Sequence, residues 1–274
     1  MVTAGAHGSR ASGGSAAFFD LDKTIIARSS TLAFSRAFFE GGLITRRSAL
    51  RSAYAQFVFG RSGADHERME KMRAYLSQLS AGWSVDTVRE IVAETLHTIV
   101  DPMVYDEAVG LIEEHRAAAR DVVIVSTSGS EVVEPIGEML GVDHVIATRM
   151  VVEDGRYTGE IAFYAFGPHK AEAIRALAAE HGYDLAASFG YSDSETDIPM
   201  LEVVGHPHVV NPDRALRRQA TARGWPVLRF TTPVALRRRL GIRPRPRQLA
   251  VLVVVAATAG GVVVWQVQHR RRMA

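Results

Sequence analysis

Short apolar runs alternate with amphipathic segments along most of this chain, and no other feature constrains its fold as strongly. The apolar runs predict buried strands, at residues 16–19, 122–125, 144–147, 188–191, 208–210 and 227–230. The amphipathic segments predict helices, at residues 106–119, 131–140, 170–181, 198–204 and 213–223. Since strands that alternate with helices form a parallel sheet covered on both faces, we expect an α/β fold.

Two segments depart from this alternation. Residues 149–164 alternate in polarity around Asp154-Gly155, which predicts a β-hairpin attached to the sheet. About 80 residues separate the first strand from the helix at 106, too many for a plain crossover loop. They carry apolar stripes at helical spacing, at positions 34–38, 54–58, 69–79 and 88–99. We therefore expect a small helical bundle, inserted after the first strand and lying over its end.

Polar residues gather where the predicted strands end. In open α/β sheets ligands bind at the carboxyl ends of the strands. The residues at these ends, or at the start of the helix that follows, are Asp20, Asp22, Ser126, Thr127, Lys170, Asp193 and Asp197. Converging carboxylates would repel one another unless a cation neutralised them, and hard oxygen ligands suit Mg²⁺. A carboxylate and Mg²⁺ side opposite an ammonium and N–H side is what a phosphoryl group requires.

Each of these residues also has an ordinary structural interpretation. A D-x-D sequence after a strand is usually a solvated turn, and a single lysine at a helix start is usually solvated. Ser128 or Ser130 would serve as the cap of the following helix. Asp193 and Asp197 would serve as an N-cap and a first-turn acid. The joint pattern, in this chain order, favours a phosphate site instead.

The set DLDKT at 20–24, the serine after VVIV, Lys170 and DSETD at 193–197 resembles the haloacid dehalogenase (HAD) superfamily. More closely, it resembles the phosphoserine-phosphatase-like subfamily IB, whose helical cap follows the first motif. The resemblance covers residues 16–232. It implies a Rossmann-like parallel sheet in a catalytic core of residues 16–26 and 106–232, with an α-helical cap at 27–105.

The resemblance also implies a chemistry for the acidic residues and the lysine. Asp20 is expected to be the nucleophile that attacks phosphorus, forming an aspartyl-phosphate. Asp22 is expected to protonate the leaving oxygen and then to activate water. The carboxylates of Asp20 and Asp193, with the backbone carbonyl of Asp22, are expected to hold Mg²⁺. Lys170 would balance the charge on the nucleophile and the phosphate.

The remaining site residues are expected to bind or support. Ser126 and the N–H of Thr127 would bind a phosphoryl oxygen. Thr24 would support the turn and the phosphate site. Asp197 would orient Lys170 or the waters of the metal rather than bind the metal directly.

The leaving group stays open. Phosphoserine phosphatases carry a cap glutamate nine residues after the nucleophile, and here that offset falls on Ser29, with no acid until Glu40. The substrate is therefore expected to be either a small phosphomonoester or a lipid phosphate. Two further interpretations remain: a phosphotransferase that uses the same intermediate, and a membrane-tethered regulator that binds phosphate ligands without turnover.

The two ends of the chain differ. Residues 1–15 are rich in Gly, Ser and Ala without an apolar block, which predicts a flexible tail and no secretory signal. No charged residue occurs in the 19 residues 249–267, enough for about 28 Å of helix, close to the thickness of a bilayer core. These residues predict a C-terminal transmembrane helix, the weaker alternative being a buried helix or strand of the core. An Arg/Pro-rich linker, residues 233–248, precedes it and suits anionic headgroups.

Basic residues orient this segment. Six arginines precede it, at 237–239, 243, 245 and 247, and three follow it, at 270–272. The heavier basic side is expected in the cytoplasm, giving a single-pass anchor in the cell membrane with the catalytic domain inside. Lipid headgroups explain the arginine cluster better than nucleic acid does, and no nucleic-acid partner is expected. Small residues at 256/260 and 257/261 allow a homodimer. The chain has no cysteine, which excludes disulfides and thiolate metal sites and fits a reducing compartment.

Overall fold

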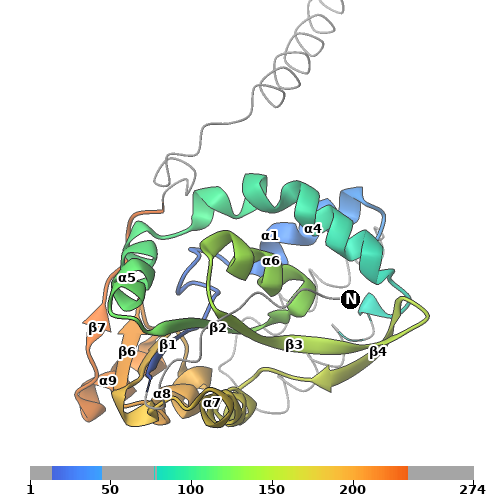
Figure 1. Cartoon of the computed structure of the whole chain (residues 1–274). Coiled ribbons are helices and arrows are strands. Elements are labelled where there is room, and N and C mark those ends of the chain that lie inside the picture. The colour runs from blue at the N-terminus through green and yellow to red at the C-terminus, as the bar shows by residue number, and fades with distance from the viewer. Residues whose placement is uncertain (1–13, 45–76, 78, 234–274) are drawn as a thin grey trace, which may run out of the picture. The chain divides into compact units, whose positions relative to one another are not determined.

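The computed structural model describes residues 14–44, 77 and 79–233 of the chain. Within these residues, the strands form a seven-stranded sheet with the order β4-β3-β2-β1-β5-β6-β7 (Figure 1). The strands are β1 Ala16–Phe19, β2 Asp121–Gly129, β3 His144–Glu153, β4 Arg156–Phe163, β5 Phe189–Ser192, β6 His206–Val210 and β7 Val227–Leu228. All neighbours run parallel except β3 and β4. The predicted α/β fold with a Rossmann-like parallel sheet is confirmed.

Strand β1 lies in the middle of the sheet. Its Phe18 is in register with Val123 of β2 on one side and with Gly190 of β5 on the other. All four residues of β1 are buried, because helices cover both faces of the sheet there. This explains why the strand is a continuous apolar run rather than an alternating one.

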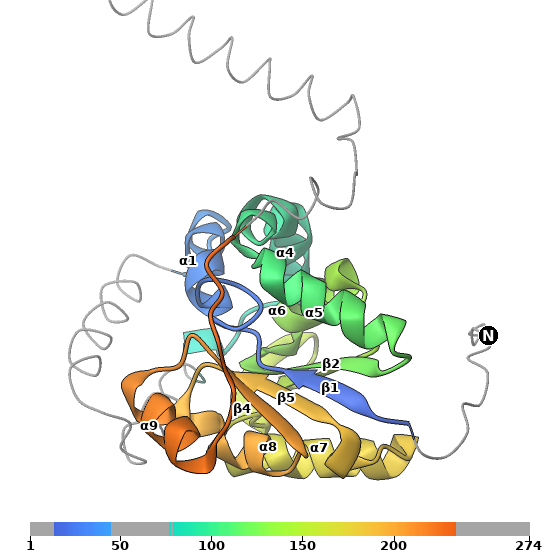
Figure 2. The same ribbon diagram turned by 90° about the vertical axis from the view of Figure 1, so that its left-hand side faces the viewer.

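Helices cover both faces of the sheet (Figures 1 and 2). α5 (Asp106–Ala117) and α6 (Ser130–Leu140) lie on one side, and α7 (Pro168–His181) and α8 (Ile198–Glu202) lie on the other. α9 (Arg214–Arg223) packs its Leu216 and Ala220 against Val209 of β6. Short 3₁₀ turns occur at Asp101–Met103 (η1), Leu185–Ala187 (η2) and Glu195–Asp197 (η3). Beneath β1 and β2, Ile174 and Met200 fill the core with Phe18 and Val123.

The predicted hairpin is confirmed. β3 and β4 are antiparallel and joined by Asp154 and Gly155, both with positive φ, 47° and 72°. Such a two-residue turn matches the twist of the strands it connects. β3 itself continues the parallel sheet beside β2, so one strand serves both the sheet and the hairpin.

Two helices of the insertion fall within the described residues: α1 (Ser30–Glu40) and α4 (Val85–Ile99). They pack against one another on the side of the sheet that carries α5 and α6 (Figure 2). The predicted stripes are buried: Phe34, Ala37 and Phe38 in α1, and Val88, Val92 and Leu96 in α4. The stripe at 54–58 and most of the stripe at 69–79 lie outside the described residues.

The chain enters and leaves this insertion at adjacent points. Ala27 donates its N–H to the carbonyl of Met103 (2.8 Å), and Tyr105 donates to the carbonyl of Ile25 (2.9 Å). Ile26 and Val104, between them, form an antiparallel bridge and are fully buried. The two connections therefore form one short paired ribbon between the sheet and α1 and α4, the helices of the predicted cap.

The described residues contain no helix that is long and apolar enough to span a bilayer. The expected transmembrane helix at 249–267 lies outside the described residues, as do most of the tail at 1–15 and nearly all of the linker at 233–248. These three assignments stay predictions.

Candidate active site

Asp20 stands at the carboxyl end of β1, where a tight turn begins. Its own N–H donates to the carbonyl of Tyr191 on β5 (2.9 Å), which continues the sheet by one residue. The carbonyl of Leu21 then accepts from Thr24 (3.3 Å), Ile25 (3.0 Å) and Ile26 (3.0 Å). Lys23 takes φ 63° to close this turn, a left-handed conformation unusual for a side chain of its size. The turn leaves the carboxylates of Asp20 and Asp22 at the same edge of the sheet.

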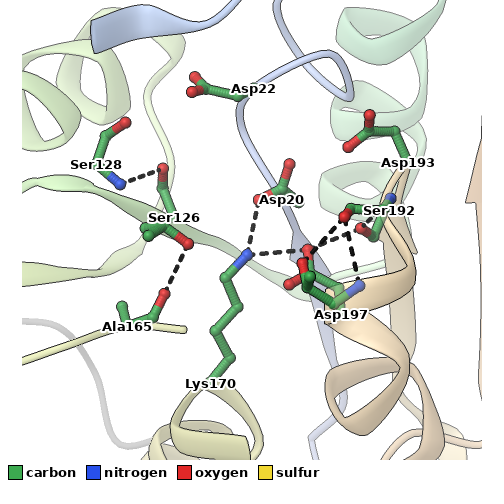
Figure 3. A network of polar contacts seen from close by, with 12 residues as sticks. Asp20, Asp22, Ser126, Ser128, Ala165, Lys170, Ser192, Asp193 and Asp197 are labelled. Atoms are coloured by element: carbon green, nitrogen blue, oxygen red, sulfur yellow. Dashed lines mark hydrogen bonds and ion pairs between the residues drawn. The ribbon is translucent and has the colours of Figure 1, made fainter. Parts of the chain in front are cut away.

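Lys170 reaches this edge from beneath, as Figure 3 shows. It sits in the first turn of α7, which begins at Pro168 after Gly167 with φ 53°. The side chain is buried, and its Nζ donates to Asp20 Oδ1 at 2.8 Å and to Asp197 Oδ2 at 2.9 Å. The hydroxyl of Ser192 donates to the same Oδ2 at 2.7 Å. One buried cation thus joins two buried carboxylates, an arrangement that holds all three side chains in fixed positions.

Burial sets the protonation of these groups. Removal from water raises the pKa of Asp20 to about 8, Lys170 opposes this shift, and Asp197 and Asp193 add to it. Burial lowers the pKa of Lys170, but attraction to Asp197 and Asp20 outweighs it, so the net shift is upward and the ammonium stays charged. Burial also raises the pKa of Asp193 to about 6, against the attraction of Lys23, whose Nζ lies 3.9 Å from Asp193 Oδ2.

These residues fit a hard divalent cation. Lys170 alone does not offset the carboxylates, because the pKa of both Asp20 and Asp193 remains raised. A cation between the two carboxylates would lower both values and keep Asp20 ionised at neutral pH. In the described part of the chain no group of three or more His, Cys, Asp or Glu side chains could hold a metal. The predicted ligand set is smaller, because it consists of two carboxylates and the backbone carbonyl of Asp22.

Asp22 lies apart from the Asp20–Lys170 pair (Figure 3). Its Oδ1 accepts a hydrogen bond from the backbone N–H of Ser30, the first residue of α1, at 2.9 Å. The side chain is only half-buried. Asp22 therefore stands between the strand end and the cap helix, where it remains within reach of solvent.

The predicted phosphate-binding residues occupy a bulge at the end of β2. The register between β2 and β3 shifts between Ser126 and Gly129, which leaves Thr127 and Ser128 outside the ladder. Ser126 is buried and its Oγ accepts the N–H of Ser128 at 3.2 Å. Thr127 turns its hydroxyl to the carbonyl of Ala165 (2.9 Å). Among the described residues Thr24 carries the one buried side-chain oxygen without a hydrogen-bond partner.

The structure thus brings six of the seven polar strand-end residues together in Figure 3, with Asp20, Lys170 and Asp197 in direct contact, and the seventh, Thr127, lies in the bulge beside Ser126. The hydroxyls of Thr127 and Thr24 do not join that network. The chemical roles that the resemblance implies for these residues stay predictions.

Three site residues escaped the sequence analysis: Ser30, Thr31 and Ser192. The interpretation of Ser128 or Ser130 as the cap of α6 is wrong, because Gly129 takes the N-cap position without a side-chain bond. The hydroxyl of Ser128 instead pairs with Ser30 (2.8 Å) and Thr31 (3.2 Å) on α1. The polar run SST at 29–31, soon after the two aspartates, was the available signal.

Comparison with known proteins agrees with this architecture. Residues 17–202 match the model of the haloacid dehalogenase-like hydrolases. The chain is 64% identical over 260 residues to the "inhibition of morphological differentiation protein" of Streptomyces azureus, across 93% of this chain and 94% of that protein. It is 57% identical over 259 residues to a "probable phosphatase" of Mycobacterium tuberculosis, across 93% and 89% of the two chains.

A solved structure shares the fold at low sequence identity. The crystal structure of a phosphoserine phosphatase in its apo form superposes with a TM-score of 0.58 at 18% identity, covering 84% of this chain and all of that one. The family match spans more than half of the chain and includes Asp20 at the end of β1 as well as the turn that carries Asp193. This protein is a member of the haloacid dehalogenase-like hydrolase family.

Proposed function

We propose that this protein is a Mg²⁺-dependent phosphatase that hydrolyses phosphomonoesters through a phosphoryl group carried on Asp20. The observation that carries the proposal is the buried contact of Lys170 with Asp20 and Asp197 at the carboxyl end of the central strand. A relative that is 57% identical over nearly the whole chain bears the name of a phosphatase, which supports the same reaction class.

The reaction takes two displacements. In the first, Asp20 attacks phosphorus, a bond forms between its carboxylate oxygen and phosphorus, and the bond from phosphorus to the leaving alcohol breaks. Asp22 gives its proton to the leaving oxygen. In the second, water attacks the same phosphorus, Asp22 takes the proton of that water, and Asp20 is released as a carboxylate.

The other residues would neutralise the charge of the phosphoryl group and orient Asp20 and the substrate. A cation bound by Asp20, Asp193 and the carbonyl of Asp22 would supply positive charge against the phosphoryl oxygens. Lys170 lies within 2.8 Å of Asp20 and keeps the nucleophile oriented while its charge changes. Asp197, fixed by Ser192, holds Lys170 in place. Ser126 and the N–H of Thr127 would bind a phosphoryl oxygen, beside the turn that contains Thr24.

The substrate is a small phosphomonoester or a lipid phosphate at the membrane. Ser29 occupies the N-cap of α1, where the phosphoserine phosphatases place a glutamate, so this chain lacks the acid that grips an amino group there. The uncharged residues 249–267 support a C-terminal anchor in the cell membrane, with the catalytic domain in the cytoplasm. Tethering would raise encounters with lipid substrates without any change in the site.

The reaction is tested with the full chain and p-nitrophenyl phosphate. Wild type should release phosphate with Mg²⁺ and lose this activity in EDTA. Asp20→Asn, nearly isosteric, should reduce the rate by at least about a thousandfold, because the nucleophile is lost. Acid-quenched wild type, analysed by peptide mass spectrometry, should carry phosphate on Asp20. Turnover that persists in Asp20→Asn would contradict the proposal.

The substrate class needs a separate comparison. Full-length protein is assayed with phosphoserine in solution and with lysophosphatidate in anionic lipid vesicles. Faster turnover of the lipid, together with cosedimentation of the protein with the vesicles, is expected for a lipid phosphatase at the membrane. Selective turnover of phosphoserine would contradict the lipid class, and phosphate transfer to an added alcohol would indicate a phosphotransferase.

A further inference from the structure

A chain of hydrogen bonds links Asp22 to Ser126 through the first turn of α1. Ser30 donates its backbone N–H to Asp22 Oδ1 at 2.9 Å. The hydroxyl of Ser30 shares a hydrogen bond with that of Ser128 at 2.8 Å. The N–H of Ser128 then donates to Ser126 Oγ at 3.2 Å, a bond visible in Figure 3. The predicted proton-transfer residue and the predicted phosphate-binding serine are therefore joined through a cap helix.

This linkage is buried where it crosses from cap to sheet. Ser30 is fully buried and Ser128 is 9% exposed, so each hydroxyl needs a partner within the protein. Thr31 adds a second hydroxyl from α1 to Ser128, at 3.2 Å. A shift of α1 away from β2 would leave these buried hydroxyls unpaired, which is unfavourable because they could not bond to water instead. The start of α1 therefore has one favoured position against the end of β2.

The same position orients Asp22. A backbone N–H in the first turn of a helix carries a partial positive charge, and its bond to a carboxylate is charge-assisted. The Ser30 N–H thus fixes one oxygen of Asp22, whereas the tight turn after β1 fixes only its backbone. An acid that must reach the leaving oxygen needs that additional restraint, since small displacements of a reacting group are costly in rate.

We propose that Ser30 and Ser128 are positioning residues, which make proton transfer by Asp22 depend on the seating of α1 against β2. The inference rests on the proposed function, in which Asp22 gives a proton to the leaving oxygen and later takes one from water. Neither serine gains or loses a proton in that sequence. Ser30 holds the carboxylate of Asp22 through its N–H, and Ser128 holds Ser30 through its hydroxyl.

Two substitutions at Ser30 separate the N–H from the hydroxyl. Ser30→Ala removes the hydroxyl and keeps the N–H. Ser30→Pro removes both, at the first helical position, where proline is well tolerated. The preceding residue, Ser29, already has the extended conformation that a following proline requires (φ −68°, ψ 126°). The two variants should therefore melt at similar temperatures, so that a difference in their kinetics reports the bond to Asp22.

The quantity measured is the dependence of kcat/KM on the leaving group of the phosphate ester. An aryl phosphate such as p-nitrophenyl phosphate leaves without needing a proton, whereas an alkyl phosphate such as glycerol phosphate needs one. With Mg²⁺ and the full chain, Ser30→Pro should lower kcat/KM for the alkyl ester by at least about tenfold relative to Ser30→Ala, and for the aryl ester by less than about threefold. A merely structural role would lower both by the same factor.

The hydrogen bond between the hydroxyls of Ser30 and Ser128 is tested by a substitution in β2. Ser128→Ala should produce a smaller loss of the same kind, greater for the alkyl ester than for the aryl ester. Ser35→Ala is the control, because Ser35 lies in α1, the helix that Ser128 contacts, with an exposed hydroxyl bonded to the carbonyl of Leu32. That control should leave the ratio of the two kcat/KM values unchanged.

Three results would overturn the inference. Equal losses for both esters in Ser30→Pro would make α1 a structural support only. Equal kcat/KM values for Ser30→Pro and Ser30→Ala would show that the N–H bond to Asp22 has no kinetic role. If wild type shows no turnover at all, the proposed function itself is refuted. Amide hydrogen exchange then tests the positioning of Asp22 by itself. The Ser30 amide should be protected in wild type and lose protection in Asp22→Ala, and an unprotected wild-type amide would refute the positioning.

Discussion

At the scale of single residues, Lys170 supplies the buried positive charge that pairs with two buried carboxylates of the site. Because Lys170, Asp20 and Asp197 are all buried, water could not replace the Lys170 ammonium as a partner of the two carboxylates. Removing one partner of a buried ion pair is strongly destabilising, because the remaining charge stays buried.

Lys170→Met should lower the free energy of unfolding by about 3 kcal/mol at neutral pH, measured by urea denaturation. Lys23→Met removes an ammonium that is mostly exposed and should change stability by less than about 0.5 kcal/mol. A Lys170→Met protein as stable as wild type would contradict this prediction.

His115 of α5 is a second buried titratable group, and it contacts Tyr191 of β5. Its Nε2 lies 2.8 Å from the hydroxyl of Tyr191, and its Nδ1 lies 3.3 Å from Arg120. Burial lowers the pKa of His115 to about 4, and the positive charge of Arg120 contributes to the shift. The folded protein therefore keeps this imidazole neutral.

Because the folded pKa lies below the unfolded value of about 6.5, the unfolded chain binds the additional proton first as pH falls. His115 should contribute up to about 3 kcal/mol of stability above pH 6.5, lost progressively as pH falls to about 4. Urea denaturation of wild type and His115→Gln between pH 7.5 and pH 4 measures the contribution as a difference. Parallel curves for the two proteins would refute it.

The residue-level contacts show where sequence reasoning stops. The aspartates and Lys170 follow from their positions at strand ends and in motifs. The partner of each hydroxyl does not, since Ser128 meets Ser30 only after the chain has folded. The pattern at Ser128 and Ser130 resembles a helix cap equally well, and local spacing cannot decide between a local and a distant partner.

At the scale of elements, the β3–β4 hairpin joins the sheet to the segment before α4. Gly82 donates its N–H to the carbonyl of Tyr157 (2.8 Å), and Tyr157 donates to the carbonyl of Trp83 (3.1 Å). Val85 donates to the carbonyl of Gly155 in the turn (3.0 Å). The conformation of the turn therefore affects the cap as well as the hairpin.

Gly155→Ala should destabilise the protein by about 1 kcal/mol, because φ 72° strains any residue with a Cβ, although open space surrounds the added methyl. Gly129→Ala is the matched control, since φ −65° suits alanine and the methyl meets no atom closer than 3.7 Å. That control should be neutral or slightly stabilising. Equal effects in urea denaturation would contradict the argument.

The elements themselves were largely predictable. Periodicity located the core strands, α5 to α9, and the buried stripes of α1 and α4, since each pattern reflects which face is buried. The pairing of residues 25–27 with 103–105 was not predictable, because it joins segments far apart in the chain whose sequences carry no turn signal.

At the scale of the whole molecule, the proposed Mg²⁺ site would couple folding to cation binding. A ligand that binds only the folded state stabilises it, by about 2.7 kcal/mol at a hundredfold excess over its Kd. Mg²⁺ should therefore raise the Tm of wild type in a thermal scan at neutral pH.

Asp193→Asn should abolish this rise, because it removes a predicted ligand. Glu195→Gln removes an equal charge from an exposed neighbour and should retain it. A rise that persists in Asp193→Asn would place the cation elsewhere.

The paired ribbon that connects the cap helices to the sheet has a consequence for engineering. The chain departs and returns through Ile26 and Val104, which touch one another, so the inserted segment is joined covalently to the core through one paired ribbon. A chimera with a foreign cap, grafted between these two positions, would leave every sheet register intact. Such a cap would also have to supply a donor for the Asp22 carboxylate, as the N–H of Ser30 does here.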